Sequence, residues 1–152
     1  MAVDVTGILG KIVDHASSSG YFDRVNTHEP KSAPGNGVSC VIWVQRIAPV
    51  PAGSGLQATT GLLEFSVRVM TNMISEPMDE IDPNIIRAVD HLLGAYSGDF
   101  ELGGEVRNVD LLGQAGTPMS AQAGYINIDH KLYRVMTITL PLIVNDLWAQ
   151  GG

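Results

Sequence analysis

The sequence has few charged residues. Asp, Glu, Lys and Arg make up 16% of its 152 residues, whereas about 25% is usual for a soluble domain. The hydrophobic share of 45% excludes a mainly disordered chain. A subunit that stands alone in water normally covers its surface with charge. The shortage therefore predicts that much of the surface is covered within an assembly.

Basic residues are scarce and scattered. Nine Lys and Arg stand against 16 Asp and Glu, for a net charge of −7. The basic residues occur singly between Lys11 and Arg134 rather than in a cluster. Non-specific binding to nucleic acid needs several phosphate contacts from one surface. The sequence therefore disfavours a dedicated DNA-binding protein, although a few basic residues could line a pore.

The single cysteine and the short apolar runs exclude further classes. Cys40 has no partner for an internal disulfide and no companions for a multi-cysteine zinc site. It lies in the apolar run over 38–47, which predicts a small buried hydrophobic residue. We see neither a signal peptide nor an apolar run near the ~18 residues of a membrane span. We therefore expect a soluble protein, with no membrane partner, made in the cytoplasm.

Motifs of catalysis and cofactor binding are missing as well. The segment from Gly7 to Lys11 lacks phosphate-binding spacing, the histidines form no metal-binding pair, and Ser54 has no nucleophile elbow. Four carboxylates lie close together in the sequence: Glu76, Asp79, Glu80 and Asp82. Together they could bind a hard cation. The preferred interpretation is that they stabilise the first turn of a helix, where acidic residues interact favourably with the helix dipole. An electrostatic docking patch is compatible with capping. We therefore expect no enzyme activity, cofactor or metal.

Hydrophobic periodicity predicts two helices and six strands. Helices are expected over 5–16 and from Asp82, as N-cap, to Gly94 or Gly98. Strands are expected over 21–25, 38–47, 62–73, 105–112, 124–129 and 133–144, with Asp129 and His130 in the last turn. The order α-β-β-β-α-β-β-β keeps strands in consecutive hairpins. It favours an α+β fold in one domain, 1–152, whose antiparallel or mixed sheet has both helices packed on one face.

Two loops and one strand are candidates for contact with partners. The loops, over 26–37 and 48–61, carry little charge, and loops of that length are usually functional or disordered. The strand over 38–47 is apolar on both faces, as in a central strand or one whose face is covered by a partner. For Trp43, and for Trp148 near the C-terminus, core packing and interface anchoring remain open alternatives.

Along nearly its whole length the sequence resembles the tail terminator proteins of long-tailed bacteriophages. The features that carry the resemblance are the end of the opening helix (Ser-Gly-Tyr-Phe-Asp-Arg-Val, 19–25), the Pro/Gly loop 28–37, the strand Ile42-Trp43-Val44 with 47–50, the segments 76–79, 81–83 and 96–100, and the closing stretch from Tyr133 to Pro141.

The resemblance implies a fold, a task and a set of partners. The family fold is a sheet with two helices and no active site. Its members form a ring, typically a hexamer, which caps the tail tube, ends its polymerisation and joins it to the head connector. The implied partners are other copies of the chain, the tail tube protein and the connector or stopper protein, at the neck of the virion. DNA would pass through the lumen without specific binding.

A closed ring needs two different complementary faces on each subunit. The candidate interface residues are Glu29, Pro30, Trp43, Arg46, Pro49, Pro51, Leu56, Arg68, Glu76, Asp79, Glu80 and Trp148. We expect the loop over 48–61 to reach the adjacent subunit or the tube. Two alternatives remain open: another neck adaptor or tail-completion protein, and a small enzyme with an unrecognised site.

Overall fold

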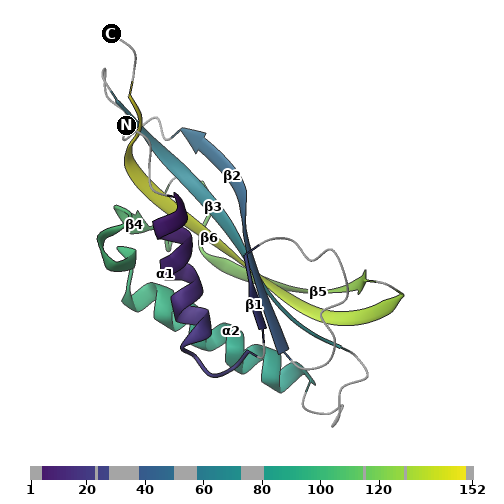
Figure 1. Ribbon diagram of the computed structural model, residues 1–152. Coiled ribbons are helices and arrows are strands. Elements are labelled where there is room, and N and C mark those ends of the chain that lie inside the picture. The colour runs from purple at the N-terminus through teal and green to yellow at the C-terminus, as the bar shows by residue number, and fades with distance from the viewer. Residues whose placement is uncertain are drawn as a thin grey trace.

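The chain folds into helices on one side of a long, twisted sheet (Figure 1). The computed structural model describes residues 5–22, 24–27, 38–49, 58–72, 81–114, 116–128 and 130–149. Its elements are α1 (Val5–Ser17), β1 (Arg24–Asn26), β2 (Val38–Pro49), β3 (Ala58–Asn72), α2 (Ile81–Gly98), the 3-10 helix η3 (Leu102–Gly104), β4 (Asn108–Val109), β5 (Ser120–Ile128) and β6 (Lys131–Ala149). The expected α+β class and the order of helices and strands are confirmed.

Six strands form the sheet, with β6 and β3 at its centre. The order is β1-β2-β3-β6-β4, and β5 pairs with the first half of β6. The pairs β2–β3, β3–β6, β4–β6 and β5–β6 are antiparallel, whereas β1 runs parallel to β2. The long β3–β6 ladder runs from Asn72 opposite Tyr133 to Ala58 opposite Ala149. The sheet is therefore mixed.

Both helices pack on the same face of the sheet (Figure 1). Each helix buries one apolar stripe, because residues three and four apart share a side of a helix. The stripes are Ile8, Ile12 and Ala16 in α1, and Ile85, Ala88, Val89, Leu92 and Tyr96 in α2. Beneath them lie alternate residues of β3 and β6, among them Phe65, Val67, Ile138 and Leu140. This layer is the main hydrophobic core.

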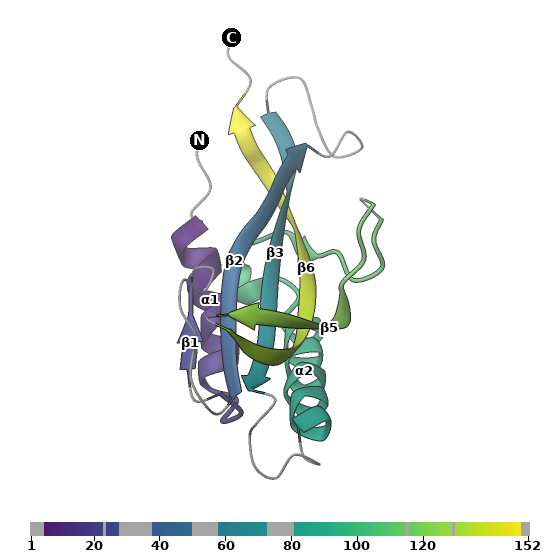
Figure 2. The ribbon, with the colours of Figure 1, turned by 90° about the vertical axis from the view of Figure 1, so that its right-hand side faces the viewer.

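The opposite face of the sheet is partly covered by the β5–β6 hairpin. Figure 2 shows β5 and the start of β6 crossing β2 and β3 on the side away from the helices. Ile126 and Ile128 of β5 pack there against a second buried cluster, formed by Val41, Met70, Tyr133 and Val135, with Trp43 at its margin. The expectation that β2 has two apolar faces is therefore confirmed.

The sequence placed several boundaries wrongly. β2 runs on to Pro49 and β3 begins at Ala58, so the predicted loop over 48–61 is too long, and Pro49 lies opposite Gly61. The pattern of alternation fades there because proline, glycine and threonines replace the large apolar residues. Residues 28–37, 50–57 and 73–80 lie outside the described part of the chain. Most of both predicted loops therefore also lies outside it.

The predicted strand over 105–112 is wrong for most of its length. Just after the 3-10 helix η3, the chain over 105–112 forms turns and the two-residue strand β4. Leu102, Gly103 and Gly104 adopt φ values of 48°, 66° and 91°, a conformation that turns the chain and ends regular structure. Helix α2 also continues through Gly94 to Gly98, which settles the choice between the two glycines as its end.

Candidate assembly surface

Trp43 and Arg68 meet on the face of the sheet opposite the helices. Trp43 pairs with Ser66 and Arg68 pairs with Val41, so the two residues are diagonal neighbours on β2 and β3. The guanidinium carbon of Arg68 lies 5.0 Å from the centroid of the Trp43 ring. Both side chains are half-buried. The structure thus brings together two residues that the sequence proposed as interface candidates.

Hydrogen bonds hold both side chains in place. The Arg68 Nε donates to Thr137 Oγ1 at 3.2 Å, and the Trp43 Nε1 donates to Gln45 Oε1 at 3.1 Å. Ser66 Oγ donates to the same Gln45 oxygen at 3.3 Å. We call these five residues the Trp43–Arg68 patch.

The patch is ordered before any partner binds. Cation–π stacking and the three hydrogen bonds restrict the rotamers of Trp43 and Arg68, so less conformational entropy remains to be lost on association. Tryptophan and arginine are also the residue types that most often dominate interface energies. The sequence missed Gln45, Ser66 and Thr137 as members of this site. The alternation of polar residues along 62–73 and 133–144 was the signal that could have found Ser66 and Thr137.

Arg46 and Pro49 lie further along β2, beyond an irregularity in the β2–β3 register at Val44/Arg46. Arg46 Nη1 is 3.8 Å from Glu64 Oε2, an ion pair too long for a hydrogen bond. The Arg46 side chain is 57% exposed, so this pair adds little stability. In the described part of the chain the buried Glu64 Oε2 accepts no hydrogen bond. Pro49 is exposed at the end of the strand.

The structure does not place the remaining interface candidates at the patch. Trp148 lies on β6 opposite Thr59, beyond the point where β2 ends, and is therefore distant from Trp43 along the sheet; only its backbone is described. Outside the described residues lie Glu29, Pro30, Pro51, Leu56, Glu76, Asp79 and Glu80.

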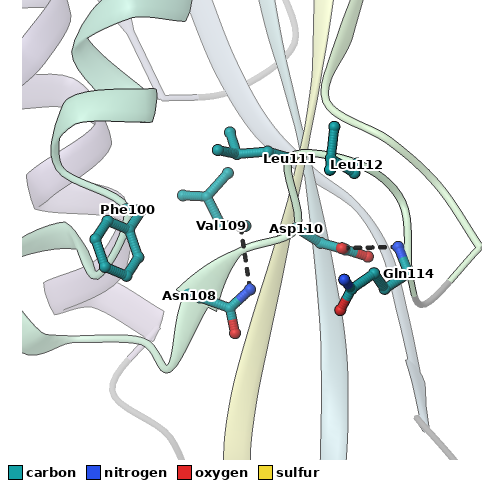
Figure 3. A pocket seen from close by; sticks show the side chains of 7 residues that line it. All are labelled: Phe100, Asn108, Val109, Asp110, Leu111, Leu112 and Gln114. Carbon is teal, nitrogen blue, oxygen red and sulfur yellow. Dashed lines mark hydrogen bonds between the residues drawn. The ribbon is translucent and has the colours of Figure 1, made fainter.

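A shallow pocket of about 280 Å³ opens beside β4 (Figure 3). Its lining residues are Phe100, Asn108, Val109, Asp110, Leu111, Leu112 and Gln114. Phe100 is 50% and Leu112 85% exposed, so apolar side chains form much of the lining. Asp110 Oδ1 accepts a hydrogen bond from the Gln114 backbone N–H at 2.9 Å, which closes the turn. The pocket therefore offers apolar contact, and its carboxylate already has a structural task.

His15, Asp99 and Cys40 are titratable groups with structural roles. His15 Nε2 lies 2.9 Å from Asp99 Oδ2, which links α1 to the end of α2. The pKa of Asp99 is lowered, first by the hydrogen bond with His15 and then by the bond that the Gly103 N–H donates. Burial raises the pKa of Cys40 to about 12, so its thiol stays protonated and unreactive at neutral pH. Cys40 is the small buried residue that the sequence predicted.

Within the described residues, no group of three or more His, Cys, Asp or Glu side chains is placed to hold a metal ion. No helix in that part of the chain is long and apolar enough to cross a membrane.

Comparison with known proteins gave matches among solved structures alone. No protein-family model matches the chain, and no curated protein sequence matches it. Among solved structures, the chain is similar to the PVC sheath/tube terminator of an extracellular contractile injection system, determined by cryo-EM in the extended state. The identity is 11% and the TM-score 0.40, over 100% of this chain. The chain spans 60% of the length of that protein, and a similarity this low assigns no function.

Proposed function

We propose that the chain is a structural subunit of a phage tail terminator. Copies of it form a ring, typically a hexamer, that caps the tail tube, stops addition of tube subunits and provides the surface to which the head connector binds. The protein has no catalytic task in this proposal and needs no cofactor. It resides at the neck of the virion, with DNA passing through the ring without specific contacts.

The Trp43–Arg68 patch is the observation that carries the proposal. The sequence named both residues as interface candidates, with core packing left open for Trp43, and their stacked, hydrogen-bonded arrangement supports a role in protein binding. The layered fold supports the same proposal, because the resemblance implies a sheet with two helices. The low charge of the chain also favours a subunit that is covered by neighbours.

A phage carrying an early stop codon in this gene tests the proposal. Without a cap, tube subunits should continue to add, so electron microscopy should show heads without tails and free tails of excess, variable length. Wild-type protein supplied from a plasmid should restore normal virions. Trp43→Ala should restore them poorly, because it removes the aromatic surface of the patch.

The matched control is Ile86→Ala, which truncates an apolar side chain on α2 that is 54% exposed. It should complement as well as the wild type. Free tails of normal length in the stop-codon phage would contradict the terminator role. Such tails, together with the protein found on isolated heads, would instead identify a connector-side adaptor.

A further inference from the structure

Among the strand edges that lack a described partner, one belongs to β2 and another to β5. β1 pairs with β2 only along Ser39 to Val41, so in the described part of the chain the outer edge of β2 over 42–49 has no neighbour. β5 pairs along one side with β6, and no described strand occupies its other side. An open edge presents backbone N–H and C=O groups that can pair with another strand.

Neither edge carries an acidic residue, and the protection on β2 is limited to Arg46, the terminal Pro49 and the register irregularity at Val44/Arg46. Natural edge strands are commonly guarded by lysines or other charges. β5 (Ser-Ala-Gln-Ala-Gly-Tyr-Ile-Asn-Ile) has no charged residue, and β2 over 42–49 has Arg46 alone. Since the whole chain has a net charge of −7, its copies repel one another wherever acidic surfaces approach. Edges free of Asp and Glu are where two copies can approach at least cost.

By register, the exposed apolar side chains of the two edges belong to the same alternating set of positions, although the hairpin crosses over the sheet and Tyr125 therefore points away from the cluster that Ile126 and Ile128 cover. Val44 pairs with Phe65 and Ile47 with Leu63, whose side chains face the helices. On β5, Tyr125 pairs with Arg134, which by alternation along β6 is on the side of Ile138. Val44, Ile47 and Tyr125 are 37%, 50% and 57% exposed. If the two edges joined in one continuous sheet, these three would become cross-strand neighbours.

The strand directions are also compatible with such a junction. β2, β3, β6 and β5 alternate in direction because each successive pair is antiparallel. A β2 placed beside the β5 of another copy would continue the alternation. An aromatic side chain between β-branched residues is a favourable cross-strand combination.

From these observations we propose that copies of this chain associate head to tail through their strand edges. The 42–49 edge of β2 in one copy pairs antiparallel with the β5 edge, residues 120–128, of the next copy. Because the two edges differ, each copy uses one edge on each side, and the assembly closes into a ring when the rotation between copies permits. The inference rests on the proposed ring and identifies the contact that builds it.

Cysteine cross-linking tests this pairing directly. One tagged chain carries Val44→Cys or Ile47→Cys, and a differently tagged chain carries Tyr125→Cys. We expect a disulfide-linked heterodimer with at least one of the two β2 positions, because a disulfide needs Cα atoms within about 7 Å. Cys40 can be left in place because it is fully buried.

The control mixture pairs Tyr125→Cys with Ile86→Cys, whose site on α2 is similarly exposed. It should give less than about a tenth of the cross-linked product, since distant cysteines cannot meet in a fixed assembly. Equal cross-linking in the control, or none at either β2 position, would overturn the proposed pairing.

A charge variant provides the second test. The double substitution Val44→Lys and Ile47→Lys should raise the dissociation constant of the ring, read by mass photometry, about tenfold or more, because pairing would bury two ammonium groups. The circular dichroism and melting temperature of the subunit should stay near those of the wild type, since both positions are already exposed. Ile86→Lys should leave the ring intact.

The results separate this inference from the proposed function. A wild-type ring that the double lysine variant also forms would overturn the edge pairing and leave the terminator role standing. Wild-type protein that stays monomeric and fails to cap tails would overturn both. Edges that cross-link only to the tail tube protein would overturn pairing between copies.

Discussion

Two tyrosines are fully buried, and they differ in whether the hydroxyl has a partner. Tyr96 donates a hydrogen bond to the Ile12 carbonyl oxygen at 3.3 Å and so ties α2 to α1. The Tyr133 hydroxyl, in the second cluster, has no hydrogen-bond partner among the described residues. A buried hydroxyl without a partner has lost its hydrogen bonds to water and has formed none within the protein to replace them.

Replacing each tyrosine with phenylalanine should therefore have opposite consequences. Tyr96→Phe should lower the free energy of unfolding by about 0.5–1.5 kcal/mol, the usual net worth of a hydrogen bond. Tyr133→Phe should leave it unchanged or raise it by up to about 1 kcal/mol, because only an unpaired hydroxyl is removed. Urea denaturation followed by circular dichroism measures both. A loss above about 1 kcal/mol for Tyr133→Phe would mean that its hydroxyl is satisfied in solution.

At the scale of elements, two glycines illustrate opposite backbone requirements. Gly94 lies inside α2, and a Cβ built there meets nothing within 4 Å. Gly113 lies in the turn after β4 with φ of +74°, and a Cβ there would be 2.6 Å from the Pro118 nitrogen. Gly94 therefore lowers the stability of a helix that would accept alanine, whereas the turn requires glycine at position 113.

Alanine substitutions at these two sites should shift the melting temperature in opposite directions. Gly94→Ala should stabilise the protein by about 0.5–1 kcal/mol, because alanine loses less backbone entropy in a helix. Gly113→Ala should destabilise it by about 1–2 kcal/mol or more, through its left-handed φ and the clash with Pro118. Differential scanning calorimetry of the two variants measures both shifts. Stabilisation by Gly113→Ala would contradict the described turn.

Elements with a regular hydrophobic period could be predicted from the sequence, and the others could not. The stripes of α1 and α2 and the alternation of β3 and β6 gave the correct element types. Failure came where structure depends on backbone dihedrals or distant partners. The positive φ values at Leu102 to Gly104 and the two-residue β4, which exists because Val109 meets Leu142, leave no periodic signal. The outer ends of β2 and β3 were missed because pairing with a neighbouring strand, β3 for β2 and β6 for β3, holds them rather than a local hydrophobic period.

The site was predictable only as a set of residue types. Trp43 was a candidate from the sequence because aromatic residues anchor interfaces and its strand is apolar on both faces, and Arg68 was named separately from it. Their stacking depends on the β2–β3 register, which pairs Trp43 with Ser66, and a shift of one residue would have sent one side chain to the other face. The crossing of the β5–β6 hairpin over this face likewise depends on sheet twist.

At the scale of the whole molecule, net charge and interface chemistry make a prediction about salt. Each copy has a net charge of −7, and copies in a ring lie within reach of one another's fields at low ionic strength, where the Debye length is about 10 Å or more. The proposed β2–β5 contact contains no acidic residue and a single basic one, Arg46. Screening should therefore weaken repulsion between copies without weakening the contact.

Raising NaCl from about 50 mM to about 500 mM should accordingly strengthen association. Mass photometry at fixed protein concentration should show the fraction of rings unchanged or increased across that range, with the dissociation constant falling a few fold. A salt-insensitive, uncharged protein of similar size serves as the control for changes in instrument response. Dissociation of the ring at high salt would contradict the strand-edge contact. It would favour instead an interface held by ion pairs, for which the acidic segment over 76–82 is the candidate that the sequence offers.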